Sequence, residues 1–173
     1  MIISNLNLGC GTAYLPYFIN VDRKNRPNVD YVCNFLQLPF DDSSVSTIYM
    51  CHSLEHIHLH SALPFLCLCR RVLIDVRIPY ISVPAFSVLA SLYLSGRVPL
   101  STIVGAIHGG QEYEGNLHYV SFDLSFLSDI LLQAGFFQIS HYQPSEFLPA
   151  GFEDTSTYKI GGKSISLNLC ATT

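Results

Sequence analysis

Short apolar runs alternate along this chain with segments whose apolar residues recur at helical spacing, and this alternation constrains the fold more than any other feature. The expected strands cover residues 5–8, 18–21, 30–33, 47–51, 76–83, 136–142 and 164–170. Early strands follow one another after short connections, and the later ones alternate with helices. This order predicts an α/β domain with a mainly parallel sheet and one antiparallel edge strand.

Helices are expected over residues 53–73, 86–94 and 123–134. In the first of them, Pro64 is expected to divide an initial turn from the main helix, because proline interrupts the helical hydrogen-bond ladder. Gly135 is expected to end the last helix. Since ligands of parallel sheets bind beyond the carboxyl ends of the strands, we expect the functional residues there.

The chain has 173 residues, which fits a single domain over residues 1–173. Only 13% of the residues are charged and 49% are hydrophobic, whereas an ordinary soluble domain carries about 25% charged residues. This shortage of charge predicts an apolar surface that is covered in a homo-oligomer, by another apolar partner, by a lipid surface or by an apolar substrate. The net charge of −4 and the scattered Lys and Arg residues lack the basic footprint of nucleic-acid binding, so no such partner is expected.

The uncharged run 78–96 is broken by Pro79 and Pro84, so no membrane span is predicted. The first residues show no secretory signal pattern. The six cysteines have no CxxC spacing and lie in apolar stretches, which is typical of reduced, buried thiols. We therefore expect a cytoplasmic protein.

A glycine turn, Gly9-Cys10-Gly11, follows the first expected strand. Such a turn lets the backbone approach a cofactor closely, although a plain tight turn explains it as well. Asp22 ends the second expected strand, where a carboxylate can accept hydrogen bonds from both hydroxyls of a ribose. A solvated turn carboxylate is the alternative for Asp22. The short spacing and the absence of a third glycine disfavour a nicotinamide dinucleotide.

Several stretches resemble the class I S-adenosylmethionine-dependent methyltransferases, specifically a small bacterial branch with the N-terminal motif Leu-Asn-Leu-Gly-Cys-Gly. The similar stretches run nearly end to end and cover residues 6–11, 20–22, 38–45, 52–56, 71–73, 82–84, 109–111, 116–118, 134–136 and 166–168. The resemblance implies a Rossmann-like, seven-stranded sheet flanked by helices. It also implies S-adenosylmethionine as the cofactor and a helical insertion at about 85–120 that covers the substrate.

The cofactor-binding residues implied by the resemblance are Gly9, Cys10, Gly11, Asp22, Asn34, Phe35, Leu36 and His52. The methionine end would lie over the glycine turn, the ribose on Asp22 and the adenine near residues 34–36. His52 would line the pocket beside the sulfonium, and capping the following helix is its alternative role. Several features depart from the family. The first crossovers are too short for a full helix, and Asn34 replaces an acid common in relatives. On the substrate side, residues 74–77 replace the family's Lys-Pro-Gly-Gly turn and Ala85 replaces a common acid.

Methyl transfer requires an acceptor lone pair held in line with the methyl carbon, so positioning supplies most of the rate. If the acceptor is a hydroxyl, His118 is the candidate catalytic base. The alternative is that His118 only pins its loop through a hydrogen bond. The acceptor is expected to be a sugar or polysaccharide hydroxyl, as the resemblance suggests, or a small metabolite.

Two other functions are compatible with the residues. Residues 52–56 spell the H-x-x-E-H pattern of a class of zinc proteases, but that chemistry needs one long helix and a further acidic ligand. Because Pro64 interrupts this segment, no metal site is expected. A non-catalytic cofactor-binding or scaffold subunit is the other alternative, since the low charge and several substituted substrate-side motifs suit it.

Overall fold

The structure is a computed structural model that describes residues 4–75 and 79–173. Its centre is a seven-stranded sheet with the strand order β3-β2-β1-β4-β5-β9-β6. The strands are β1 (Ser4–Leu8), β2 (Ile19–Asp22), β3 (Tyr31–Val32), β4 (Val45–Cys51), β5 (Pro79–Pro84), β6 (Phe137–His141) and β9 (Ser166–Thr172). A separate small hairpin consists of β7 (Lys159–Ile160) and β8 (Lys163–Ser164).

The predicted α/β fold with a mostly parallel sheet is confirmed. Strands β1 to β5 pair in parallel, and β9 pairs antiparallel with both β5 and β6. The antiparallel strand is therefore not at the edge, because β6 pairs with its outer side and lies one strand further out. The expected strand over 76–83 begins at Pro79 in the described part of the chain, and residues 76–78 lie outside that part.

The helices of at least one full α-turn are α1 (Leu59–Val72), α2 (Phe86–Leu94), α3 (Leu100–His108), α4 (Leu124–Gln133) and α5 (Pro144–Phe147). Short 3-10 helices are η1 (Phe35–Gln37), η2 (Leu54–His56), η3 (Glu114–Asn116) and η4 (Thr155–Thr157). The largest described helix, α1, has too few residues to cross a bilayer, and the described helices include no candidate membrane span.

The predicted division of segment 53–73 at Pro64 is wrong. The break falls at Ile57 and His58, whose backbone is extended between η2 and α1. Pro64 lies within α1, where it removes one backbone hydrogen bond near the helix start. The following residues Phe65 and Leu66 are fully buried. Their burial stabilises the helix by more than one lost hydrogen bond costs, at about 1.5–3 kcal/mol per side chain.

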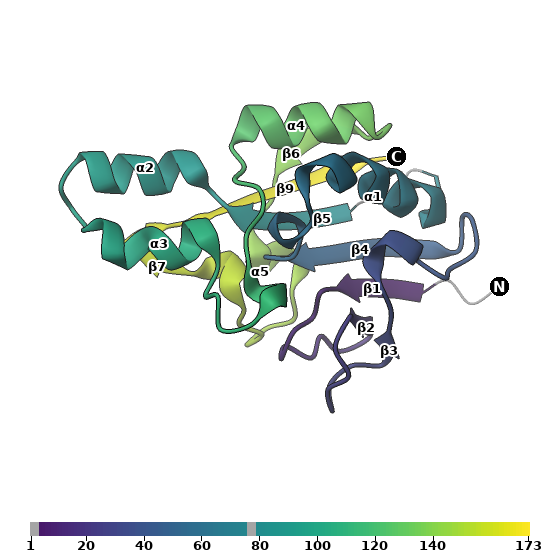
Figure 1. Cartoon of the computed structure of the whole chain (residues 1–173). Helices are drawn as coiled ribbons and strands as arrows, with labels where there is room; N and C mark the ends of the chain where they lie inside the picture. The colour runs from purple at the N-terminus through teal and green to yellow at the C-terminus, as the bar shows by residue number, and fades with distance from the viewer. Residues whose placement is uncertain (1–3, 76–78) are drawn as a thin grey trace.

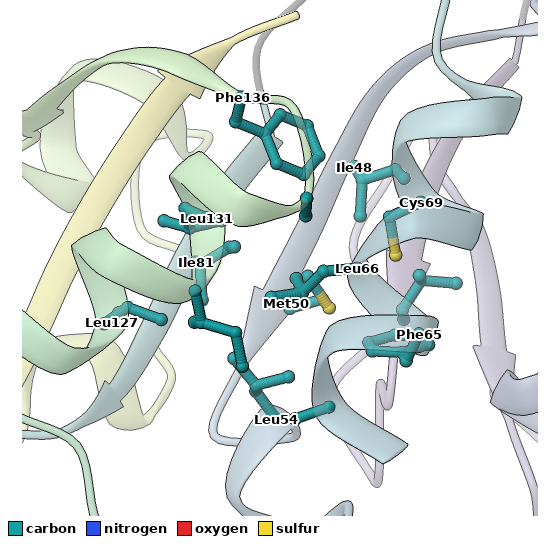
Figure 2. Packing of buried hydrophobic residues seen from close by; sticks show 14 of the residues in the cluster. Ile48, Met50, Leu54, Phe65, Leu66, Cys69, Ile81, Leu127, Leu131 and Phe136 are labelled. Atoms are coloured by element: carbon teal, nitrogen blue, oxygen red, sulfur yellow. The ribbon is translucent and has the colours of Figure 1, made fainter. Parts of the chain in front are cut away.

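One face of the sheet packs against α1 and α4 (Figure 1). Alternate residues of β4 point to opposite faces, so Ile48 and Met50 lie in this core while Tyr49 and Cys51 face the other side. Figure 2 shows α1 supplying Phe65 and α4 supplying Leu127 to the same core. This packing fixes the strand ends from which the site is built.

The opposite face is covered by loops and the short α5 instead of full crossover helices, as the short first connections predicted. Buried Asn20 holds the loop between β1 and β2 in place. Its side-chain oxygen accepts hydrogen bonds from the Leu15 amide (2.8 Å) and the Asn7 side chain (2.9 Å), and its nitrogen donates to the Leu15 and Phe18 carbonyls. Phe147 of α5 packs on Phe18 in the same layer.

Candidate active site

A cavity of about 490 Å³ opens at the carboxyl ends of β1, β2 and β4. Its lining includes the predicted residues Gly9, Gly11, Asp22, Asn34, Phe35, Leu36 and His52. Cys10, which was also predicted, is absent from this lining and borders a second cavity instead. The structure thus brings together most of the residues expected to hold the cofactor.

The glycine turn is shaped by close backbone contacts. The Gly9 and Cys10 amides both donate to the carbonyl of Val21, at 2.8 and 3.1 Å, so β1 runs directly into the turn beside β2. Gly9 has φ +76°, and a Cβ there would lie 2.4 Å from Ser53 Oγ. Only glycine satisfies both conditions, and the open backbone that results forms part of the cavity wall.

Asp22 lies at the end of β2, as predicted, with its carboxylate at the cavity. One oxygen accepts from the Gly11 amide (3.0 Å). The other accepts from the Lys24 amide (2.8 Å) and lies 3.0 Å from Nη1 of Arg26. These contacts orient the carboxylate, and each oxygen still has acceptor capacity for a further donor.

The segment 34–36 forms another wall of the cavity. Asn34 caps η1 by accepting a hydrogen bond from the Leu36 amide at 3.1 Å. Phe35 stacks on Phe65 of α1, with ring centroids 5.9 Å apart. Leu36 is partly exposed at the cavity. An apolar ring and an amide side by side suit a flat aromatic group such as a purine.

Sequence reasoning missed the outer wall of this cavity, where Arg23 and Lys24 meet Tyr113 and Gly115. Lys24 Nζ lies 3.0 Å from the centroid of the Tyr113 ring, a cation–π contact between segments about ninety positions apart in the chain. No local pattern indicates this contact, since it depends on how the 109–119 loop folds back over the sheet.

A second cavity of about 760 Å³ adjoins the first. The two share the wall residues Gly9, Gly11, His52 and His56. The second is also bordered by α3 and by the 152–158 segment, with the side chains of Tyr49, His118, Phe152, Asp154, Thr155 and Tyr158 in its lining. Tyr49 Oη donates to Asp154 Oδ2 at 2.5 Å. Polar and aromatic groups therefore converge on this second space.

His52 follows β4 with a left-handed backbone, φ +48°. Its amide donates to the Ser82 carbonyl (2.9 Å), and Nε2 lies 2.9 Å from Ser166 Oγ. The residue that precedes η2 is Ser53, so His52 does not have the alternative capping role. Burial, followed by the neighbouring His118, lowers the pKa of His52 to about 4, and its neutral ring lies between the two cavities.

His118 lines the second cavity and not the first. Its Nδ1 lies 3.1 Å from the Ala106 carbonyl, which can only accept, so this nitrogen carries the proton. Nε2 is left with a lone pair. The hydrogen bond from Nδ1 fixes the loop to α3, as the alternative role of His118 required. The lone pair on Nε2 can still accept a proton. Burial, followed by neighbouring His56, lowers the pKa of His118 to about 4.

Glu55 was not among the predicted site residues. Its side chain is fully buried, with Oε1 3.6 Å from His52 Nδ1 and 3.9 Å from His118 Nε2. Burial raises the pKa of this carboxyl to about 8. The contact with His118 crosses from η2 to the 109–119 loop, which docks through the Tyr119 amide and the Glu55 carbonyl (2.8 Å). In the sequence, Glu55 was noted only as the acid of the H-x-x-E-H pattern in the zinc-protease alternative.

Comparison with known proteins finds similarity at the level of structure. Neither the protein-family models nor the curated proteins include a match. Among solved structures, an S-adenosylmethionine-dependent methyltransferase from Thermotoga maritima, described as a possible histamine N-methyltransferase, aligns with TM-score 0.62 and 15% identity over 98% of this chain and 81% of its own. A second such enzyme, from Archaeoglobus fulgidus, aligns with TM-score 0.59 and 14% identity over 99% of this chain and 86% of its own.

A third similar structure is the 1,6-didemethyltoxoflavin-N1-methyltransferase of Burkholderia thailandensis, with its substrate and S-adenosylhomocysteine bound. It aligns with TM-score 0.58 and 16% identity over 98% of this chain and 70% of its own. All three alignments extend over at least 98% of this chain. The chain has the Rossmann-like fold of the S-adenosylmethionine-dependent methyltransferases.

Proposed function

We propose that this protein binds S-adenosylmethionine in the first cavity and transfers its methyl group to an acceptor in the second. The observation that carries the proposal is the shared wall of the two cavities, formed by the glycine turn, His52 and His56. A methyl group beside this wall would face an acceptor directly, which is the positioning that methyl transfer requires. The fold supports the same function.

For the cofactor, the Gly9–Gly11 backbone would bind the methionine end, Asp22 the ribose hydroxyls, and residues 34–36 the adenine. The two oxygens of Asp22 accept from separate amides, which orients the carboxylate for two neighbouring hydroxyl donors. Cys10 would contribute its backbone only, since its side chain is buried and burial raises the pKa of the thiol to about 11. His52 would lie beside the sulfonium as a neutral ring.

For the acceptor, the second cavity favours a molecule with hydroxyl groups, such as a sugar, a polysaccharide end or a small metabolite. Asp154 and Thr155 offer hydrogen bonds, and Tyr158 and Phe152 offer aromatic faces. The helical insertion at about 85–120 would cover the acceptor through α3. We propose that His118 acts on the acceptor in the second cavity and does not contact the cofactor. An unchanged turnover in His118→Ala, once an acceptor is known, would contradict this assignment.

The same proposal includes the setting of the protein. The Leu-Asn-Leu-Gly-Cys-Gly motif supports placing the chain in the small bacterial branch of class I. All six cysteines lie within the described residues and are free thiols, which supports the reducing environment of the cytoplasm.

The test is calorimetric titration of the purified protein with S-adenosylmethionine and S-adenosylhomocysteine. We expect micromolar binding, weakened at least tenfold in Asp22→Ala and Asp22→Asn, because hydrogen bonds to a charged carboxylate contribute about 1.5–3 kcal/mol each. Asp129→Ala is the matched control. It removes one exposed carboxylate from α4, outside both cavities, and makes the same change in net charge as Asp22→Ala.

Absence of binding by folded wild-type protein would contradict the proposed function. Equal binding by wild type and both Asp22 variants would contradict the ribose contact. Tight binding without formation of S-adenosylhomocysteine across a broad acceptor screen would favour the non-catalytic scaffold. Thermal melts of all variants separate loss of a contact from loss of the fold.

A further inference from the structure

The carboxylate of Glu55 is an unusual buried group. The side chain has no exposed surface, and neither oxygen has a hydrogen-bond partner among the described residues. Leaving such a group without a partner costs free energy, and buried carboxylates are normally paired or coordinate a metal. The position of Glu55 therefore points to a ligand.

Two histidine rings in the same cluster as Glu55 each have one nitrogen bonded to a backbone carbonyl. Nδ1 of His56 donates to the Leu117 carbonyl (2.9 Å) and Nδ1 of His118 donates to the Ala106 carbonyl (3.1 Å). Each carbonyl can only accept, so each Nε2 carries the lone pair. A histidine that binds a metal usually donates its other N–H to a backbone carbonyl or a carboxylate, which fixes the ring and its tautomer. Both rings already have this arrangement.

We propose that Glu55, His56 and His118 bind Zn²⁺ or a similar divalent transition-metal ion. One ligand atom from each of the three side chains lies within 4.8 Å of the other two. Zinc binds nitrogen and oxygen ligands at about 2.0–2.2 Å, which places tetrahedral ligands about 3.3 Å apart. Binding of an ion would therefore require rotations of the side chains that bring the three ligand atoms closer together. Two imidazoles and a carboxylate form a typical ligand set for zinc or a neighbouring transition metal.

The cluster is separate from the other histidines of the segment. His58 and His60 stack on each other, with ring centroids 5.5 Å apart, and His58 also packs on Tyr119. His52 is a neighbour of the cluster, since Nδ1 faces Glu55 Oε1 and Nε2 contacts Ser166. The site therefore differs from the H-x-x-E-H pattern of zinc proteases, in which both histidines are ligands, because Glu55 takes the place of His52 in the cluster.

A metal bound here would lie at the boundary of the two cavities, because His56 lines both and His118 lines the second. Three protein ligands leave a coordination position open. The role of that position rests on the proposed function: it would hold an acceptor oxygen and lower its pKa. The acceptor O–H then loses its proton to solvent. The oxygen lone pair forms the bond to the methyl carbon, and the carbon–sulfur electron pair stays on sulfur, which leaves S-adenosylhomocysteine.

The experiment is metal titration of tag-free protein after dialysis against a chelator, with Zn²⁺ by calorimetry and Co²⁺ by visible absorption. We expect one ion per chain and a visible absorption spectrum that is typical of Co²⁺ with a low coordination number. Glu55→Gln and His118→Ala should weaken Zn²⁺ binding by at least about 10-fold, because loss of a ligand costs no less than loss of a contact that supports a ligand. His60→Ala, which removes a nearby imidazole outside the cluster, should leave binding unchanged.

Absence of Zn²⁺ and Co²⁺ binding by folded wild-type protein would overturn the proposal. Zn²⁺ binding by Glu55→Gln equal to that of wild type would overturn it as well. Glu55→Gln keeps the size and shape of the side chain, so its thermal melt shows whether the fold is retained. Cofactor titration is a separate readout: zinc binding without cofactor binding would contradict the proposed function alone, and the reverse result would contradict the metal site alone.

Discussion

Gly9 and Gly11 have similar backbone conformations but different surroundings. Both have positive φ, at +76° and +57°. A Cβ at Gly11 would meet open space, whereas one at Gly9 would overlap Ser53, whose hydroxyl is held by the Leu8 carbonyl. A side chain at either position would therefore place a residue with a Cβ in the left-handed region. Only at Gly9 would the side chain also overlap a neighbour.

We expect Gly11→Ala to lower the free energy of unfolding by about 1–2 kcal/mol, the cost of a left-handed backbone for a residue with a side chain. Gly9→Ala should lower it by about 1–3 kcal/mol more, because the new methyl group overpacks a fixed neighbour. Urea unfolding of the two variants and wild type measures the difference. Equal destabilisation by both substitutions would show that the contact with Ser53 relaxes freely.

The site residues that could be predicted are those that lie close together in the sequence. The glycine turn and Asp22 follow directly from two adjacent strands, and both line the expected cavity. Glu55 and His118 are far apart in the chain, and their contact depends on how the 109–119 loop docks on η2. Nothing in the pattern around either residue specifies that docking, so the cluster could not be predicted.

At the level of elements, the sheet face opposite α1 and α4 depends on a polar side chain where a helix would otherwise lie. Asn20 is fully buried and joins the loop between β1 and β2 to β1 itself. Asn20→Ala would leave buried partners such as the Leu15 amide unpaired, at about 1–3 kcal/mol each. We expect a loss of about 3 kcal/mol in the free energy of unfolding, measured by urea titration.

The matched control is Asn25→Ala, which removes the same amide from an exposed position in the next loop. Its effect should stay within about 0.5 kcal/mol. A small effect of Asn20→Ala, similar to that of the control, would mean that water replaces the network and that the loop is held by its apolar contacts instead.

The elements themselves were largely predictable from periodicity, and their arrangement less so. Alternating burial in β4 and helical spacing in α1 and α4 reflect which face of each element meets the core. The position of β9 could not be predicted, because the alternation shows that a strand is buried and not which strands are its neighbours. The break at Ile57 was missed since extended backbone there carries no proline or glycine signal.

At the level of the whole molecule, exposed apolar residues gather on α2 and α3. The composition predicted that such a surface exists but not where it lies. Exposed members of this surface are Phe86, Tyr93, Leu94, Leu100 and Val104. Figure 1 shows the two helices beyond the carboxyl ends of β1 and β4. Association with a second copy, one of the alternatives that the composition predicted, would cover them.

We expect light scattering to show self-association that increases with protein concentration and decreases in Leu94→Lys. The Leu94 side chain is 82% exposed, so the substitution should leave the fold intact. Leu132→Lys is the matched control, since Leu132 is 51% exposed on α4, away from this surface. A monomer at all concentrations without detergent would count against an interface between copies.

The interior position of β9 affects how the polypeptide can fold while it is being synthesised. Strand β6 emerges from the ribosome before β9, yet it joins the sheet only through β9. Until residues 166–172 arrive, the outer edge of β5 and the whole of β6 have unpaired backbone groups, which are templates for aggregation. A nascent chain halted between β6 and β9 should therefore depend on chaperones more than one halted before β6.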